Sequence, residues 1–525
     1  MERRSVLKGI AGVSAAAWLP VGPATAQTTK TLVIMTPELV MLTGAFNSAG
    51  TIYLMSAKIF DGLVEYDFDF NMKPQLAESW EISEDMKTMK FSLKPGVKWH
   101  DGKEFTSHDV AWSAINVWQK LHPRGRATFA NLEGVDTPDD VTAIFRFSKS
   151  SPAVLKALHS TESQILPKHL YEGTDIVTNP LNVAPVGTGP FRFVQWERGS
   201  HVTLERNPDY WDAGKPMVDR LVIRTISDNT ARAAAVESQE VLAGGGSPLP
   251  MREAERLSEK PYLMIPEKGD EAFGGQAWME FNLRRPIFQD LRVRQAIAHA
   301  INREQLMKIV WYGFGSPGTG PINPGMKPFY TPDVPRYDFD LEKAAALLDE
   351  AGYPLKADGT RFEITHDPMP YSQEYFRTGD FVKQALSKVG IVVNIRSQDI
   401  ATWLRRIYTE RDFDTINASA HNLTDPAIGV QRFFWSKNII DGVPFSNGSG
   451  YANQQVDQIL ETAQSEPNTE KRIELYQQFQ KLVAAELPQI ALVNLPWMTI
   501  QNRRVTPLDD TPYGAHGNFA NVTLS

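Results

Sequence analysis

Residues 88–110 read TMKFSLKPGVKWHDGKEFTSHDV, and they set a strand, a turn and a helix start in a short space. Apolar and polar residues alternate from Thr88 to Leu93, which predicts a half-buried β-strand. A helix is predicted from Ser107 to Leu121. Outward from this segment, 30–35 and 141–147 also have strand character. Helices are predicted over 290–312, 340–351, 374–389, 453–464 and 469–487. This alternation of signals predicts a mixed α/β fold.

The first 26 residues have the order of an export signal. Arg3 and Arg4 precede an apolar run from Gly9 to Trp18 that is too short to span a bilayer, and Ala24–Ala26 supplies small residues for cleavage. We therefore expect a twin-arginine signal peptide over 1–26. We expect a mature, soluble protein in a Gram-negative periplasm, without direct membrane insertion.

Composition excludes several classes of partner. The chain has 525 residues and no cysteine, so we expect neither a disulfide nor a lipid-modified cysteine. The signal carries three basic residues against Glu2, and removing it changes the net charge from −8 to −10. An acidic chain argues against nucleic acid as a partner.

Motifs that would indicate cofactor or metal chemistry fail in their context. Gly313, Gly315 and Gly318 match a dinucleotide fingerprint, but they follow a predicted helix instead of a strand, so we expect a loop. Residues 67–78 resemble a calcium loop, but position six is Met72, so an acidic hairpin is expected. No nucleophile elbow or HExxH motif is present. We expect no cofactor, no metal site and no catalytic residue, with a periplasmic hydrolase kept as the alternative of a different class.

Four stretches resemble the peptide/nickel family of extracellular solute-binding proteins, which serve ABC importers. The matching segments are 76–110, 185–211, 281–304 and 388–391. They include PVGTGPF at 185–191 and LERNPDYW at 204–211. Together they run through most of the mature chain in the family's order.

This resemblance implies two hinged lobes with a ligand in the cleft between them, plus an extra subdomain. We expect lobe I to comprise 27–60, 196–275 and 496–525, the extra subdomain to comprise 61–195, and lobe II to comprise 276–495. The implied partners are a peptide or other small molecule, an inner-membrane permease and its ATPase subunits. A monomer is expected.

The resemblance also implies two charged anchors for a peptide, and this sequence departs from both. Asn422, or His421 with a shifted gap, stands where the family has an aspartate for the amino terminus. Met369, before Pro370-Tyr371, stands where dipeptide binders have an arginine for the carboxylate. Either Asp425 and a cation such as Arg377 take over, or the ligand is an opine, a modified peptide, a short oligosaccharide or a metal chelate.

We expect nine residues to contact the ligand. Phe46 and Asn47 are expected in the loop after the first strand and Trp278 near the lobe crossing. Exposed backbone over 419–422 could pair with an extended ligand. Core packing is the alternative for each aromatic residue, and a helix cap before Pro426 is the alternative for Asp425. The nine are Phe46, Asn47, Trp278, Tyr371, Ser419, Ala420, His421, Asn422 and Asp425.

Overall fold

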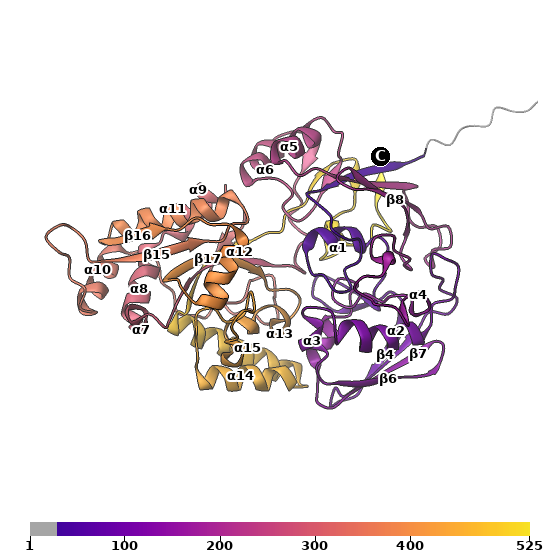
Figure 1. The fold of residues 1–525 in the computed structure, drawn as a ribbon, viewed down its shortest axis with the longest axis horizontal. Coiled ribbons are helices and arrows are strands. Elements are labelled where there is room, and N and C mark those ends of the chain that lie inside the picture. The colour runs from indigo at the N-terminus through magenta and orange to yellow at the C-terminus, as the bar shows by residue number, and fades with distance from the viewer. Residues whose placement is uncertain (1–28) are drawn as a thin grey trace, which may run out of the picture.

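A computed structural model of the chain describes residues 29–525. The expected signal peptide, 1–26, lies outside the described residues. The chain forms two lobes side by side, and Figure 1 shows the N-terminal half in one lobe and most of the residues after 275 in the other. The mixed α/β architecture expected from the sequence is confirmed.

Lobe I is built on a seven-stranded sheet with the order β12-β19-β11-β1-β10-β9-β8. The first strand, β1, is an interior strand, because it pairs in parallel with β10 on one side and with β11 on the other. The strands are β1 (Thr31–Thr36), β8 (Phe191–Glu197), β9 (His201–Arg206), β10 (Arg220–Thr225), β11 (Ala243–Gly244), β12 (Leu263–Met264) and β19 (Ile500–Asn502). Helices α1 (Gly50–Ser56), α5 (Asn229–Glu237) and α6 (Met251–Ser258) belong to the same part of the chain.

A separate four-stranded antiparallel sheet, β4-β5-β7-β6, contains the strand predicted over 88–93. Its burial alternates along β5 as the sequence pattern predicts. The strands are β4 (Ala77–Ile82), β5 (Thr88–Leu93), β6 (Leu132–Asp139) and β7 (Thr142–Phe147), beside helices α2 (Ser107–Ser113), α3 (Gly125–Thr128) and α4 (Lys168–Tyr171). The acidic segment 67–71 closes a hairpin between β2 (Val64–Tyr66) and β3 (Met72–Pro74).

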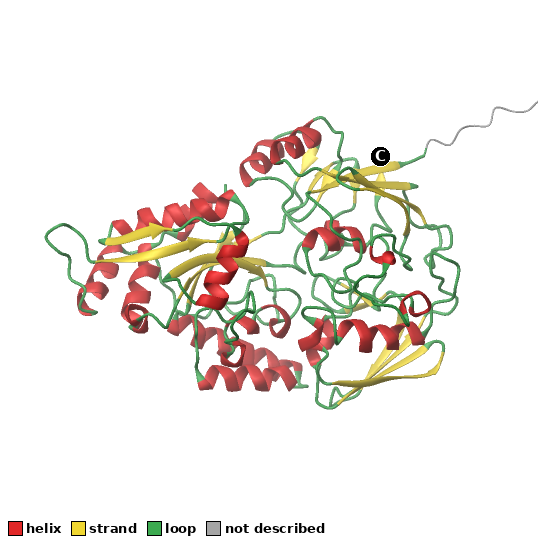
Figure 2. Cartoon of the chain, in the orientation of Figure 1, coloured by secondary structure: helices red, strands yellow, loops and turns green. Residues whose placement is uncertain are grey.

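Lobe II has a six-stranded mixed sheet with the order β14-β18-β13-β17-β15-β16. Helices lie on either side of it (Figure 2). Its strands are β13 (Gly275–Phe281), β14 (Ser316–Pro317), β15 (Phe362–Pro368), β16 (Ile391–Ile395), β17 (Thr415–His421) and β18 (Gln489–Leu495). Its helices are α7 (Pro286–Gln289), α8 (Leu291–Ala300), α9 (Arg303–Val310), α10 (Leu341–Glu350), α11 (Gln373–Ser387), α12 (Ile400–Arg405), α13 (Pro426–Gly429), α14 (Gln454–Ser465) and α15 (Thr469–Glu486).

The single helix predicted over 290–312 is wrong, because the chain breaks after Ala300. Ile301 is extended, and the Asn302 side chain accepts a 2.9 Å hydrogen bond from the amide of Gln305. Asn302 therefore caps a new helix, α9, and the polar cap overrides the continuous apolar stripe. The helix predicted over 107–121 is regular only to Ser113 and continues as a π-helical turn over Ala114–Trp118.

Two sequence segments, 99–102 and 185–191, meet in space at a tight turn. The amide of Gly187 donates to His100 Nδ1 at 3.2 Å, and His100 Nε2 donates to the carbonyl of Gly189 at 2.9 Å. A Cβ on Gly187 would lie 1.9 Å from the carbonyl oxygen of Ile59. Glycine is therefore required here by close backbone contact, and the turn leads directly into β8.

The chain crosses between the lobes twice, once between β12 and β13 and once between β18 and β19. The crossings are tied together, since Asp270 Oδ2 accepts a 2.5 Å hydrogen bond from the amide of Trp497. Hydrogen bonds also join the lobes away from the crossings. Thr424 Oγ1 donates to the carbonyl of Lys156 at 2.6 Å, and the amide of Met251 donates to Glu374 Oε1 at 3.3 Å. A few residues thus carry the connection, as in hinged proteins.

Candidate functional site: a cavity between the lobes

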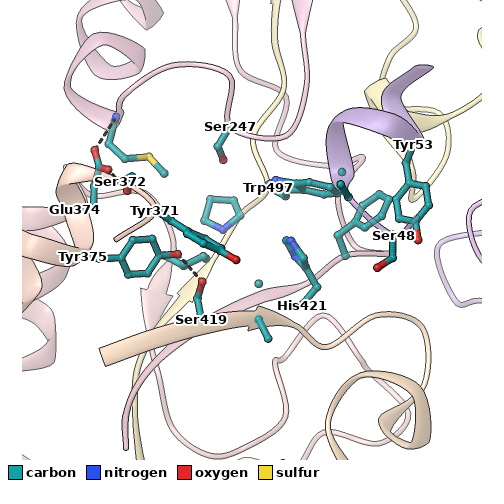
Figure 3. A pocket seen from close by; sticks show the side chains of 18 of the residues that line it. Ser48, Tyr53, Ser247, Tyr371, Ser372, Glu374, Tyr375, Ser419, His421 and Trp497 are labelled. Atoms are coloured by element: carbon teal, nitrogen blue, oxygen red, sulfur yellow. Dashed lines mark hydrogen bonds between the residues drawn. The ribbon is translucent and has the colours of Figure 1, made fainter. Parts of the chain in front are cut away.

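A cavity of about 790 Å³ lies where the two lobes face each other. Its volume falls within the range of small-molecule binding sites. Figure 3 shows Glu374 and Ser372 on one side, Ser48 and Tyr53 on the opposite side, and Tyr371 and Trp497 between them. The lining comes from α1, the start of α6, both crossings, the start of α11 and the end of β17. Any change in the angle between the lobes therefore changes the cavity.

The end of β17 presents unpaired backbone to the cavity. On one side β17 pairs with β13 as far as His421. On the other side its register with β15 ends at Asn417, whose carbonyl accepts from the amide of Met369 at 3.0 Å. Because backbone groups alternate direction along a strand, Ser419 and His421 point the same way as Asn417. Within residues 29–525, no strand pairs with them on that side.

An aromatic wall extends from the end of β17 across the second crossing. The Trp497 ring lies 4.4 Å from His421 and 4.3 Å from Phe273, centroid to centroid, and stacks on His516 at 4.3 Å. A Cβ on Gly50 would lie 2.1 Å from the Trp497 ring. Residues from lobe II, both crossings and α1 thus meet around one tryptophan.

His421 is neutral in this setting. Burial, assisted by the charges of Arg124 and Arg432, lowers its pKa to about 4. A neutral imidazole offers the cavity one donor or acceptor and no charge.

Two of the arginines that line the cavity are already engaged. Arg124 donates through Nε to Glu162 Oε2 at 2.9 Å and through Nη2 to the Tyr53 hydroxyl at 2.6 Å. Arg232 donates to the carbonyls of Ile226, Ser227 and Pro248. These bonds hold the two arginine side chains against the protein and leave them little capacity to bind a ligand.

Glu374 and Arg432 also line the cavity, and neither forms an ion pair within the described part of the chain. Glu374 Oε2 accepts from the Ser372 hydroxyl at 2.5 Å, and Oε1 accepts from Met251. The guanidinium of Arg432 lies over the Phe433 ring, and its Nε is buried without a hydrogen-bond partner. Burial lowers the pKa of Arg432 to about 10, with a further contribution from Arg124.

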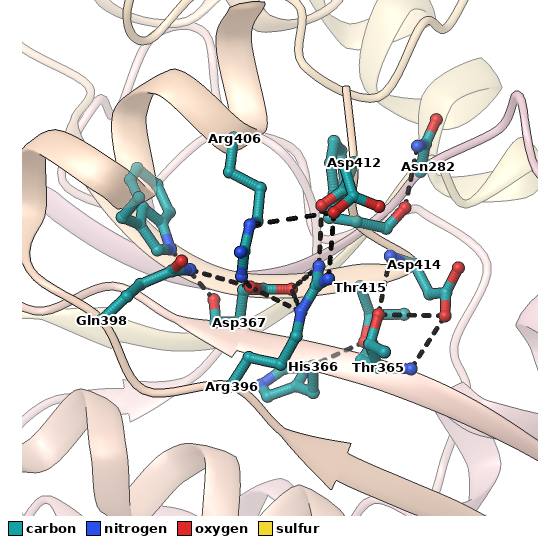
Figure 4. Close-up of polar contacts among 12 residues, drawn as sticks. Asn282, Thr365, His366, Asp367, Arg396, Gln398, Arg406, Asp412, Asp414 and Thr415 are labelled. Atoms are coloured by element: carbon teal, nitrogen blue, oxygen red, sulfur yellow. Dashed lines mark hydrogen bonds and ion pairs between the residues drawn. The ribbon is translucent and has the colours of Figure 1, made fainter. Parts of the chain in front are cut away.

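A contrasting cluster in lobe II has its charges fully paired. The buried carboxylate of Asp367 accepts from Arg396 Nη2 at 2.7 Å and lies 3.7 Å from Arg406, and Arg396 also pairs with Asp412 (Figure 4). This cluster stabilises the packing of β15 against its neighbours and offers nothing to a ligand.

Of the nine residues expected at the site, the structure places five in the cavity lining. The other four lie elsewhere. The five are Asn47, Tyr371, Ser419, Ala420 and His421.

Phe46 and Trp278 pack into the two cores instead of lining the cavity. Phe46 contacts the lobe I core. Trp278 is 3% exposed, donates to Glu280 Oε2 at 3.1 Å and packs edge-on to Phe433. The core-packing alternative therefore describes both residues, and Trp278 is buried because β13 is buried on both faces.

Asn422 and Asp425 are committed to structure. Asn422 Oδ1 accepts from the amide of Asn323 at 2.5 Å. Asp425 is 0% exposed, caps α13 by accepting from Ala427, and receives two hydrogen bonds from Arg472. Asp425 therefore cannot replace an amine anchor, and Arg377, which donates to Tyr312 on the surface, is not in the cavity lining either.

Sequence reasoning missed several lining residues, chiefly Trp497, Glu374, Tyr375 and Arg432. Glu374 and Tyr375 lie in the first turn of the predicted helix, three and four residues after Tyr371. Their closeness to Tyr371 in sequence could have indicated that they share its site. Trp497 follows the expected return to lobe I at 496. Arg432 lies in an irregular segment and carries no sequence signal.

The described part of the chain has neither a membrane-spanning helix nor a cluster of metal-binding side chains. Within residues 29–525, no helix combines the length and apolar character that a membrane span requires. In the same residues, no group of three or more His, Cys, Asp or Glu side chains is arranged to hold a metal ion.

Known proteins are similar to this chain in sequence and in fold. Residues 71–441 match the family model described as bacterial extracellular solute-binding proteins, family 5 Middle. The chain is 27% identical over 503 residues to the dipeptide-binding protein of Escherichia coli, covering 91% of each chain. It is 26% identical over 471 residues to the glutathione-binding protein GsiB of Salmonella paratyphi A, covering 86% of each.

A solved structure shares the two-lobed fold. It is AgaA of A. tumefaciens R10 in complex with agropinic acid, with a TM-score of 0.75 and 26% identity, covering 94% of this chain and 99% of that one. The match of the family model over most of the length agrees with the fold and the cavity described above. The chain belongs to family 5 of the bacterial extracellular solute-binding proteins.

Proposed function

We propose that this protein is the substrate-binding component of an ABC importer and captures a peptide in the cavity between its lobes. The unpaired end of β17 carries this proposal, because Ser419 and His421 offer backbone groups in the position where an extended ligand would add a strand. The two named sequence relatives, which bind a dipeptide and glutathione, support a peptide.

The mechanism needs no chemistry on the ligand. Contacts to both lobes favour the closed arrangement, so ligand binding shifts a balance between open and closed states. Hydrogen bonds to Ser419 and His421 in lobe II, and to Asn47 and Ser247 in lobe I, would supply such contacts. The closed form would then be the one that docks on the permease, whose ATPase subunits drive import.

The remaining parts of this proposal follow the family resemblance. We place lobe I at 27–60, 196–275 and 496–525, the extra subdomain at 61–195, and lobe II at 276–495. The sheets support this division, although β8 begins at Phe191, five residues before the boundary at 196. We assign export to the periplasm through a twin-arginine signal over 1–26, and a monomeric state.

A non-peptide solute is the second candidate. Met369 is fully buried and Asn422 is bonded to Asn323, so neither expected anchor of a free peptide is present in its family position. The structural neighbour AgaA in complex with agropinic acid supports this alternative.

Native mass spectrometry of protein purified without denaturation tests the proposal. We expect a retained solute that raises the melting temperature when it is added back to ligand-free protein. Fragmentation of that solute distinguishes a peptide from the other classes. Absence of any solute, with no change in melting temperature across a peptide library, would contradict the proposed role.

A further inference from the structure

The charges in the cavity are unevenly satisfied. Four charged side chains line it: Arg124, Arg232, Glu374 and Arg432. Arg124 is neutralised by Glu162, and Arg232 is held by backbone carbonyls. Glu374 and Arg432 have no ion-pair partner among the described residues, and the Arg432 Nε, unlike that of Arg232, is buried without a hydrogen-bond partner. An unpaired charge in a poorly hydrated site is costly, and a ligand of opposite charge would remove that cost.

The two unpaired charges lie at different ends of the cavity. Glu374 is beside Ser372 and Met251, on the side opposite Tyr53 (Figure 3). Arg432 belongs to the other end, because its turn, Gln431–Phe433, contacts α13, which in turn contacts α3. Arg124 lies at the start of α3 and donates to Tyr53. The cavity is therefore acidic at the α11 end and basic at the α3 end.

Both groups have unused bonding capacity. The Glu374 carboxylate accepts one hydrogen bond on each oxygen, leaving further lone pairs. The Arg432 guanidinium has a planar set of donors suited to bidentate bonding of a carboxylate, and no hydrogen bond from it is found within residues 29–525.

We propose that the cavity binds a solute with its carboxylate at Arg432 and its ammonium group at Glu374. This orientation is the reverse of the one implied by the resemblance, in which the amine lies near the 417–426 loop and the carboxylate lies near Pro370-Tyr371. A basic residue, Arg432, therefore stands at the end where the family has an acidic anchor. An acidic residue, Glu374, stands at the end where dipeptide binders have an arginine. This inference rests on the proposed function as a solute-binding protein and deepens it.

The test compares three peptides that differ only at their ends: trialanine, trialanine amide and N-acetyl-trialanine. Wild type, Arg432→Gln, Arg432→Lys and Glu374→Gln are titrated with each by calorimetry. Wild type is expected to bind trialanine at least tenfold more tightly than either blocked peptide, or ~1.4 kcal/mol.

The variants separate the two ends. Arg432→Gln should bind trialanine and its amide equally while still discriminating against the acetylated peptide, and Arg432→Lys should retain part of the discrimination. Glu374→Gln should show the opposite loss. Arg432→Gln removes an unpaired charge, so its unliganded melting temperature should not fall, which excludes misfolding as the cause.

Three results would overturn the inference: Arg432→Gln still discriminates against the amide, Glu374→Gln loses that discrimination instead, or wild type binds none of the three peptides. If wild type nevertheless retains a solute through purification, the proposed function stands and only the charge orientation fails. If it retains no solute and binds no peptide, both fail.

Discussion

Arg472 Nη1 and Nη2 donate to the two carboxylate oxygens of Asp425 at 2.6 and 2.7 Å, and both side chains are nearly inaccessible to solvent. The pair joins the cap of α13 to α15 inside lobe II. A carboxylate held in this way has no free position for a ligand, although the sequence around it suggested a binding role.

Asp425→Asn should therefore affect folding and not binding. Removing one partner leaves Arg472 as an uncompensated buried charge, and we expect the free energy of unfolding to fall by about 3–5 kcal/mol. Urea denaturation measures this loss, and ligand affinity at low temperature should be unchanged. The double variant Asp425→Leu/Arg472→Met is the control and should recover most of the stability. A stable Asp425→Asn protein with weakened binding would restore Asp425 to the site.

Gly187→Ala tests the turn at which residues 99–102 and 185–191 meet. The new Cβ would lie 1.9 Å from the carbonyl oxygen of Ile59, so the backbone must shift, and we expect a loss of several kcal/mol or failure to fold. Gly134→Ala is the matched control, since nothing lies within 4 Å of its Cβ position. Thermal melting of both variants is the measurement; equal melting temperatures would refute the packing argument.

His100 makes stability depend on pH. Burial lowers its pKa to about 4, below the ~6.5 of an unfolded chain. A depressed histidine pKa contributes stability that is present above pH 6.5 and is lost as pH falls towards 4, because protonation would cost the bond from Gly187 to Nδ1. Between pH 7 and 5 the loss from this residue should reach about 2 kcal/mol.

The variant His100→Gln isolates that contribution. Its stability should fall less than that of wild type over the same pH range, as measured by urea titration at pH 7 and pH 5. Burial also lowers the pKa of His122, His366 and His421 to about 4 and that of His516 well below its usual value, so some acid sensitivity remains. Identical pH dependence in variant and wild type would show that folding does not lower the pKa of His100.

Ser419→Pro tests whether the β17 edge pairs with the ligand. Proline removes the amide that faces the cavity, and we expect affinity for the retained solute to fall at least tenfold, or ~1.4 kcal/mol. Ser419→Ala removes only the hydroxyl, which bonds to Tyr375 Oη at 2.5 Å, and should lose less. Calorimetry with the solute recovered from wild type decides between them. A larger loss for alanine would assign recognition to the side chain and not the backbone.

The sequence predicted most elements of the fold because local patterns and motifs determine them. The alternation over 88–93 and the capped helix over 340–351 both appear where expected, as β5 and α10. The break at Ile301–Asn302 was missed, although Asn302 three residues before Gln305 is a recognisable cap. The segments that resemble the family most closely, 76–110 and 185–211, build the framework of lobe I and the proposed extra subdomain. None of their residues lines the cavity.

The binding site was harder to predict because its residues come from separate elements and their roles depend on partners. Asn422 and Asp425 lie next to Ser419 and His421 in sequence, but they form internal bonds with Asn323 and Arg472. Arg432, which lines the cavity, has no such partner among the described residues. Whether a charged residue is paired is a property of the tertiary structure, and spacing in the sequence does not reveal it.

Closure around a solute is the central claim, and small-angle X-ray scattering measures it most directly. Protein stripped of its solute by reversible unfolding is compared with the same protein after the solute is restored. The account predicts a smaller radius of gyration with solute, as the lobes come together across Thr424 and Lys156. An unchanged radius of gyration at saturating solute would contradict a hinged binding protein.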